Sequence, residues 1–387
     1  MAFTNSGRNL GAFARAVKEA RESTRTEFVD PGYREASGQS LSYRQARERV
    51  EEYLHEAPKQ SFDDIIGNED ALSQLQDAIE APVKHKKLYE AYNMRMPKGA
   101  LLCGPPGCGK TMFARAAAST MQKLYNTKEF ISVSGAELQS PYVGVTEAKI
   151  KAMFDFAREY KKQHKCPLLI FMDEADALLP DRTGRVRRVA SWEESQVATF
   201  LAEMDGMHES GAFVLLATNR PEVIDQAVLR DGRCDFKITV KKPTIDAIKV
   251  IIKNNFKDCL LHDKVDDLIF AATECFTDPH KVIAHAEMVW GNDEKIIGSH
   301  GKDFTLEYIL SGAMAASLPY RAARYAFNRD KKNNRPQGIK VEDVIAAVND
   351  IFEENAGLEH SFALNEFKRE FGKEVQGKMN EQNKKLN

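Results

Sequence analysis

One short segment constrains the fold of this chain more than any other: Gly-Pro-Pro-Gly-Cys-Gly-Lys-Thr at residues 104–111. An apolar run at 99–103 precedes it and a helical pattern at 112–121 follows it, which is the strand, loop and helix setting of a P-loop. In such a loop, glycines allow backbone N–H groups to converge on phosphate oxygens, and the helix directs its positive dipole end at them. The predicted phosphate site comprises Pro106, Gly107, Cys108, Gly109, Lys110, Thr111 and Met112.

Four side chains have distinct expected tasks in nucleotide chemistry. Lys110 is expected to reach the β- and γ-phosphates of ATP, and the Thr111 hydroxyl to bind Mg²⁺. Further along, the apolar run at 168–172 ends in Asp173-Glu174. A buried strand that delivers two adjacent carboxylates at its carboxyl edge suits the same chemistry. Asp173 would bind Mg²⁺, and Glu174 would polarise the attacking water.

Five short apolar runs, separated by longer helical patterns, set the expected fold class. Strands that alternate with helices are typical of parallel βαβ construction. We predict an α/β fold with a P-loop parallel five-stranded sheet and helices on both faces, followed by a small all-helical lid. The expected strands are 99–103, 130–133, 168–172, 213–217 and 236–240.

The sequence predicts two subdomains flanked by shorter appendages. Residues 61–243 would form the nucleotide-binding subdomain and residues 244–356 the helical lid. Residues 1–60 are predicted to form an arm or linker, with short helices at 9–22 and 42–56, because they are too few for a packed domain.

The carboxy-terminal residues 357–387 form the fourth predicted part. Four apolar residues there have near-helical spacing, which predicts a helix that either docks on a partner or packs on its own subunit. These residues are Leu364, Phe367, Phe371 and Val375.

The composition is that of an ordinary globular chain and excludes several classes. In 387 residues, 55 basic and 57 acidic side chains give a net charge of −2, which argues against a protein that coats nucleic acid. The longest apolar stretch, 212–217, is far shorter than the roughly 18 residues of a membrane helix. The six cysteines form no Cys-x-x-Cys pair, which predicts reduced thiols without structural zinc. With no secretory signal apparent, we expect a cytoplasmic protein without a membrane partner.

Between residues 62 and 243 the chain resembles the AAA+ ATPases, and within them the AAA clade of protein unfoldases and disassembly machines. The local sequence is most similar to that of proteasomal regulatory ATPases of the actinobacterial type and of FtsH-like ATPase modules. Besides the P-loop and the Asp-Glu pair, the resemblance rests on segments at 61–71, 217–220 and 228–236. It implies an adenine pocket formed by Asp64, Ile65, Ile66 and Gly67.

The same resemblance implies further catalytic residues and an oligomer. Asn219 stands where the family keeps its sensor-1 residue, which orients the lytic water. Arg230 and Arg233 are the candidate arginine fingers, which cross a subunit interface and neutralise charge on the γ-phosphate. A finger supplied in trans implies an oligomer, and the family usually forms hexameric rings. Asp205-Gly206-Met207 stands where the family has Asp-Gly-Phe, a motif that couples neighbouring subunits.

A protein substrate is implied by residues 140–154, which correspond to pore loop 1 of the family and its helix. Tyr142-Val143-Gly144 fits the aromatic, hydrophobic, glycine pattern that grips a threaded polypeptide. An aromatic ring suits this task because it contacts any side chain by area, without reading sequence. The implied function is a ring-forming motor that hydrolyses MgATP to unfold, thread or disassemble protein substrates through a central pore.

The chain departs from the family pattern in the lid and at its carboxyl end. The lid's usual Gly-Ala-Asp would correspond to residues 276–280, Phe-Thr-Asp-Pro-His, which lack it, and no sensor-2 arginine can be assigned. The final Lys-Lys-Leu-Asn lacks the penultimate tyrosine by which proteasomal ATPases dock on their peptidase. We therefore expect an ATPase motor without a proteasome partner.

Two basic clusters keep a nucleic-acid-dependent ATPase open as the alternative, such as a replication, recombination or transcription accessory. Mixed basic and aromatic residues suit single-stranded nucleic acid, although they equally suit solvated faces that pair with acidic residues. A third reading is a regulatory switch that assembles with ATP. The clusters are Arg182, Arg185, Arg187 and Arg188, and Arg321, Arg324, Tyr325, Phe327, Arg329, Lys331, Lys332 and Arg335.

Overall fold

The computed structural model describes residues 42–127, 129–182, 190–205, 211–230, 232–292 and 295–356, with the backbone alone at 286–292 and 295–300. The helix expected at 9–22 and the segment 357–387 lie outside these residues. Within the described part of the chain, no helix is long and apolar enough to cross a membrane.

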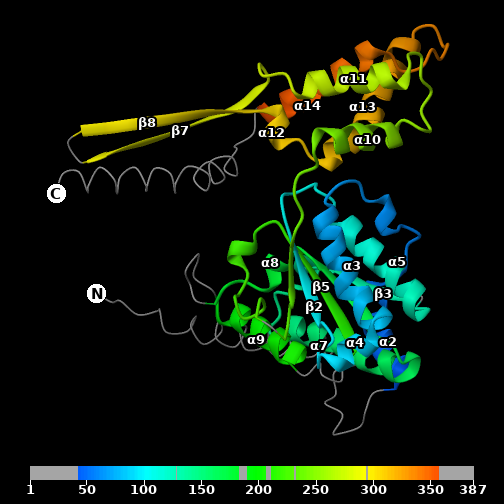
Figure 1. Cartoon of the computed structure of the whole chain (residues 1–387), viewed down its shortest axis with the longest axis vertical. Helices are drawn as coiled ribbons and strands as arrows, with labels where there is room; N and C mark the ends of the chain where they lie inside the picture. Colours follow the sequence, from blue (N-terminus) through cyan, green and yellow to red (C-terminus); the bar gives the residue numbers. More distant parts are fainter. Residues whose placement is uncertain are drawn as a thin grey trace, which may run out of the picture. The chain divides into compact units, whose positions relative to one another are not determined.

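A six-stranded sheet forms the centre of the nucleotide-binding subdomain (Figure 1). Its strands are β1 (Leu54–Glu56), β2 (Gly99–Cys103), β3 (Glu129–Ser134), β4 (Leu168–Asp173), β5 (Ala212–Thr218) and β6 (Phe236–Thr239). Their order is β1–β3–β4–β5–β2–β6, and β2 to β6 are parallel. The predicted parallel P-loop sheet is confirmed, and all five strands lie where the apolar runs placed them. Ligands bind at the carboxyl edge of such a sheet.

Helices bury both faces of this sheet, which explains why its strands read as continuous apolar runs. All seven residues of β5 are buried. Phe171, Phe213 and Leu215 pack with the helices α3 and α5, whereas α7 packs on β4 and β5 with a separate set of buried residues. The helices are α3 (Glu69–Lys84), α4 (Lys86–Ala91), α5 (Lys110–Tyr125), α6 (Gly135–Leu138), α7 (Val145–His164), α8 (Ala175–Leu178) and α9 (Ser191–Asp205), with short 3₁₀ turns η2 (Phe62–Asp64) and η4 (Pro221–Val223).

The prediction of a helical arm up to residue 60 is wrong for residues 43–56. The expected helix at 42–56 is instead α2 (Tyr43–Glu48), the turn η1 (Glu51–Tyr53) and the strand β1. β1 pairs antiparallel with β3 and adds a sixth strand to the sheet. Arg47 holds this segment through an ion pair with Glu129 at 3.0 Å. An edge strand of three residues has too short a pattern to predict from sequence.

The lid contains helices with an apolar core of their own, which confirms the expected helical carboxy-terminal region. α13 and α14 pack together, and α11 packs on α14. Buried residues from each long helix, such as Ile248, Leu268, Leu318 and Val344, form this core. The helices are α10 (Ile245–Asn255), α11 (Val265–Phe276), α12 (Leu306–Ile309), α13 (Gly312–Asp330) and α14 (Val341–Ala356).

The lid is not all-helical, however, because a β-hairpin lies between α11 and α12 (Figure 1). Its strands are β7 (Val282–Asn292) and β8 (Lys295–Thr305). The two strands pair antiparallel, from Val282 with Thr305 to Asn292 with Lys295. Alanine, glutamate and methionine interrupt the β-branched and aromatic residues of β7, which weakens the strand pattern.

Candidate active site

The glycine-rich loop connects β2 to α5 at the carboxyl edge of the sheet. Gly107 and Gly109 have φ values of +72° and +92°, in the left-handed region that favours glycine. A Cβ atom at Gly104 would lie only 2.1 Å from the carbonyl oxygen of Val240. The backbone therefore requires glycine at these positions, and α5 begins immediately after the loop, so its first N–H groups are available to an anion.

Lys110 is buried beneath this loop and reaches across to the neighbouring strand. Its Nζ donates to the carbonyl oxygens of Gly104 and Pro105, each at 2.9 Å, and to Oδ1 of Asn219 at 2.6 Å. Burial lowers the pKa of Lys110 from its usual value. The structure thus brings together two residues that are 109 positions apart in the sequence.

Thr111 and Asp173 meet beside Lys110. The Thr111 hydroxyl donates to Oδ2 of Asp173 at 3.0 Å, at the end of β4. Hydroxyl and carboxylate oxygens are ligands that Mg²⁺ accepts, and in phosphate sites the ion takes few protein ligands and keeps waters and phosphate oxygens. The pair therefore fits a magnesium ion held jointly with a nucleotide.

Glu174 follows Asp173 and is held in an uncommon backbone conformation, with φ of +50°. Its Oε2 accepts a hydrogen bond from the Ser134 hydroxyl at 3.0 Å. The backbone N–H of Glu174 donates to Oδ1 of Asp173 at 2.9 Å. The sequence analysis did not identify Ser134. It could have been found as the polar residue that ends β3, the strand adjacent to β4.

A hydrogen-bonded pair also fixes the end of β5, where Asn219 stands. The Thr218 hydroxyl donates to Oδ1 of Asp176 at 2.6 Å and accepts from the backbone N–H of Arg220 at 2.9 Å. These bonds hold the backbone on both sides of Asn219 against α8. The polar groups at the ends of β3, β4 and β5 thus converge on the loop after β2.

The sequence at 100–242 matches the family described as ATPase family associated with various cellular activities (AAA). Residues 100–242 are an AAA ATPase domain. The matched segment contains all the P-loop, β4 and β5 residues described above.

Relatives of similar sequence carry ATPase names. A protein of Corynebacterium efficiens named AAA ATPase forming ring-shaped complexes is 35% identical over 328 residues, covering 83% of this chain and 60% of the relative. Proteins named proteasome-associated ATPase, from Thermobifida fusca and from a Mycobacterium species, are each 32% identical and cover 83% of this chain. These cover 57% and 54% of the two relatives. The chain therefore spans little more than half the length of the curated relatives it matches.

Beside the AAA domain's P-loop edge lies a cavity of 450 Å³, bounded by both subdomains. Ile66 and Gly67 line it, together with Ala247 and Val250 of α10. The predicted Ile65 instead packs partly buried against the apolar core. Two of the four residues expected to form the adenine pocket, Ile66 and Gly67, thus line one cavity whose other wall is the lid.

The lid touches the P-loop through the first turn of α13, which corrects the interpretation of residues 276–280. The backbone N–H of Ala313 donates to the carbonyl oxygen of Gly107 at 3.1 Å, and Ser311 caps the helix by accepting from Met314. In this chain the Gly-Ala pair that lies against the P-loop is thus Gly312-Ala313, followed by Met314.

The two candidate arginine fingers of the AAA domain differ in their surroundings. Arg233 makes a two-pronged ion pair with Asp205, at 2.8 and 2.7 Å, and also donates to the carbonyl oxygen of Ala227. Arg230 is exposed. Asp205 thus has a partner within its own chain, while Gly206 and Met207 lie outside the described residues.

The predicted pore loop is exposed at the start of α7. The exposed fractions of Tyr142 and Val143 are 66% and 92%. Gly144 precedes the helix with φ of +86°. Ser140 fixes the base of the loop, since its N–H donates to the Thr146 hydroxyl at 3.1 Å and its hydroxyl accepts from the Tyr142 N–H at 3.2 Å.

Three of the eight residues of the basic and aromatic cluster in the lid make ion pairs or hydrogen bonds, and the other five are exposed. Arg321 pairs with Glu354 at 2.7 Å, and the Tyr325 hydroxyl donates to Asp350 at 2.5 Å. Arg329 pairs with Asp330 and Asp343. In the other cluster Arg182 pairs with Asp225, whereas Arg185, Arg187 and Arg188 lie outside the described residues. The described contacts favour a structural role for Arg182, Arg321, Tyr325 and Arg329.

Proposed function

We propose that this chain is a ring-forming ATPase that hydrolyses MgATP and uses the energy to unfold, thread or disassemble a protein. The observation that carries the proposal is the convergence of Lys110, Asn219, Thr111, Asp173 and Glu174 at the carboxyl edge of one sheet. Lys110 is a cation that can bind phosphate, Thr111 and Asp173 offer two oxygens to a metal ion, and the carboxylate of Glu174 can activate a water molecule. These are the parts that phosphoryl transfer to water requires.

Each residue has a role that follows from its contacts. Lys110 would exchange its loop carbonyl partners for phosphate oxygens. Thr111 and Asp173 would hold Mg²⁺, which when bound screens the negative charge of the phosphates. Glu174 would accept the proton of the attacking water, and Ser134 keeps that carboxylate oriented through its hydrogen bond. Asn219, fixed by its neighbours on β5, would orient the same water.

Ring assembly is supported by the exposure of Arg230 and by relatives named for ring-shaped complexes. We infer a homo-hexamer in which Arg230 and Arg233 act in trans, at the nucleotide of the adjacent subunit. The name of the relative describes ring-shaped complexes of that protein, so ring formation by this chain must be tested separately. Mass measurement in solution with and without a non-hydrolysable ATP analogue provides it, with a nucleotide-dependent hexamer as the expected result.

Replacing Tyr142 with alanine is expected to abolish work on a protein substrate and to leave ATP hydrolysis within about twofold of the unmodified chain. The side chain is two-thirds exposed, far in the sequence from the residues around Lys110, and it offers the large contact area that a moving polypeptide needs. The measurement is the loss of fluorescence from a folded fluorescent protein that carries an unstructured tag, with phosphate release recorded in parallel.

The matched control for this variant is Tyr320→Ala, because Tyr320 is an equally exposed tyrosine on α13. This control is expected to change neither readout. Unimpaired unfolding by the Tyr142 variant would remove the threading proposal and leave ATP hydrolysis intact. Stimulation of phosphate release by single-stranded DNA or RNA, with a steep salt dependence, would instead favour the nucleic-acid alternative.

A further inference from the structure

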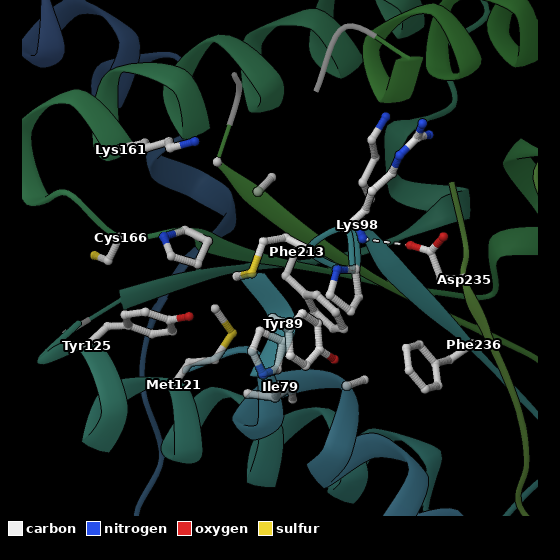
Figure 2. Close-up of a pocket in the computed structure, with 18 of the residues that line it drawn as sticks. Ile79, Tyr89, Lys98, Met121, Tyr125, Lys161, Cys166, Phe213, Asp235 and Phe236 are labelled. Atoms are coloured by element: carbon white, nitrogen blue, oxygen red, sulfur yellow. Dashed lines mark hydrogen bonds between the residues drawn. The ribbon is translucent and has the colours of Figure 1, made fainter. Parts of the chain in front are cut away.

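The base of a nucleotide held by the P-loop needs a cavity at the same edge of the sheet. An apolar cavity of 1160 Å³, with Phe213 in its wall, lies at the opposite edge, where the backbone N–H of Lys98 donates to Asp235 at 2.8 Å (Figure 2). Lys98 precedes β2 and the P-loop follows it, so the length of the strand separates this cavity from the phosphate site. The cavity of 450 Å³ beside Ile66, Gly67 and α10 is therefore the one that suits the base.

The backbone of Ile66 and Gly67 offers hydrogen-bonding groups to this smaller cavity. Among the described residues, none makes a hydrogen bond with a backbone N–H or carbonyl oxygen of these two. The groups are therefore available to a ligand. Adenine presents a donor at N6 where guanine presents an acceptor at O6. A carbonyl and an N–H that keep fixed directions can therefore distinguish the two bases.

The directions of these groups depend on two consecutive residues with a left-handed backbone. The φ value is +76° at Gly67 and +60° at Asn68. Glycine adopts this region freely and leaves it as freely, so Gly67 alone does not fix its peptide groups. Asparagine adopts it less readily, and the conformation persists where other contacts hold it. The contacts of Asn68 thus decide how firmly this wall of the cavity is held.

Asn68 is held by its side chain, in a way that capping of a helix does not explain. It is the N-cap residue of α3, where asparagine ordinarily accepts a hydrogen bond from the first turn, yet its side chain makes no capping bond there. Its amide instead pairs with both polar backbone groups of Lys241. Nδ2 donates to the carbonyl oxygen of Lys241 at 3.0 Å, and Oδ1 accepts from the N–H of Lys241 at 2.7 Å.

This amide pair connects the wall of the cavity to the phosphate loop. Asn68 and Lys241 both line the cavity. The residue before Lys241, Val240, donates its N–H to the carbonyl oxygen of Cys103 at 2.8 Å, at the end of β2 and directly before the P-loop. A Cβ atom at Gly104 would lie 2.1 Å from the carbonyl oxygen of Val240, so the two segments are in close contact. Asn68 therefore sets the base-facing backbone relative to the phosphate site.

We propose that Asn68 is a positioning residue that makes the nucleotide site select adenine over guanine, by holding the backbone of Ile66 and Gly67 in one direction toward the base. The inference rests on the proposed ATPase function and adds the source of its base selectivity. The described hydrogen bonds of the Asn68 side chain go to Lys241, and none reaches Lys110 or Glu174. The side chain therefore acts on binding of the base rather than on the chemical step.

Replacing Asn68 with glycine removes both bonds to Lys241 and keeps a residue that adopts a φ of +60° without strain. Phosphate release from ATP and from GTP is measured over a range of concentrations. We expect KM for ATP to rise about tenfold while kcat changes less than twofold. The ratio of kcat/KM for ATP to that for GTP is expected to fall at least tenfold, because the direction of the base-reading groups is lost.

The matched control is Asn93→Gly, because Asn93 is an exposed asparagine with a φ of +51° that lines neither cavity. It is expected to leave KM and the ATP-to-GTP ratio unchanged. Asn68→Asp serves as the second variant, since it keeps the size of the side chain and replaces the Nδ2 donor with an oxygen that the Lys241 carbonyl repels. We expect a lower ratio here too, with thermal melting confirming that each variant is folded.

The outcomes separate this inference from the proposed function. An ATP-to-GTP ratio that stays within twofold in either Asn68 variant, or that falls equally in Asn93→Gly, would overturn the role of Asn68 and leave the ATPase intact. A fall in kcat without a change in KM would overturn it as well. Phosphate release from neither nucleotide by the unmodified chain would contradict the ATPase function itself, and the selectivity with it.

Discussion

Replacing Glu174 with glutamine is expected to slow phosphate release by a factor of about 10²–10⁴ and to leave ATP binding nearly unchanged, because the amide cannot accept the water's proton. The side chain keeps its shape, so the hydrogen bond from the Ser134 hydroxyl at 3.0 Å can be retained by the amide oxygen. Thr111 and Asp173 keep their mutual hydrogen bond, and the magnesium site is untouched. Steady-state phosphate release and binding of a fluorescent ATP analogue measure the two effects.

The control substitution is Glu342→Gln, an exposed glutamate in the first turn of α14, which is expected to leave both quantities unchanged. Ser134→Ala should give an intermediate loss of about tenfold in rate, because the carboxylate of Glu174 loses one orienting bond but keeps its basicity. Normal turnover by the Glu174 variant would show that another group activates the water.

The parallel sheet and the catalytic edge could be predicted because their signals are local. The P-loop glycines are required by backbone geometry at Gly104, Gly107 and Gly109, so a short pattern identifies the turn. Asp173 and Glu174 directly follow a buried strand, and parallel strands bring their carboxyl ends to the same edge. The sequence therefore predicted that these side chains meet, although it gave no distances.

The predictions for β1 and for the lid failed because these parts of the fold depend on contacts between residues that are far apart in the sequence. β1 is only three residues long and exists because Leu54 to Glu56 pair with the edge of β3. The hairpin β7–β8 separates α11 from α13, so the Gly-Ala of the lid lies some 35 residues beyond the position expected from a continuous set of helices. The hydrogen bond from Ala313 to Gly107 and the close approach of Ser311 to the same glycine place this turn at the P-loop. The apolar cavity is likewise built from segments that no single pattern unites.

Replacing Arg230 with alanine is expected to lower the rate of hydrolysis by about 10³-fold with little change in ATP affinity, because a finger acts on charge that develops in the transition state. Arg230 is exposed and can reach across an interface directly, whereas Arg233 is bonded to Asp205 and Ala227 of its own chain and must release them before it can act in trans. Arg233→Ala is the comparison, and its expected effect is lower thermal stability together with slower hydrolysis.

Mixing two inactive variants tests whether the finger acts in trans. In a ring of heterologous contacts, a Glu174→Gln copy still supplies Arg230 to its neighbour, and an Arg230→Ala copy still supplies Glu174. With random mixing, about a quarter of the interfaces combine both intact groups, so hydrolysis should recover to about a quarter of the unmodified rate. Each variant alone should remain inactive. No recovery, with mixed rings confirmed by mass, would place the catalytic arginine within the same subunit or elsewhere, and the trans assignment would be wrong.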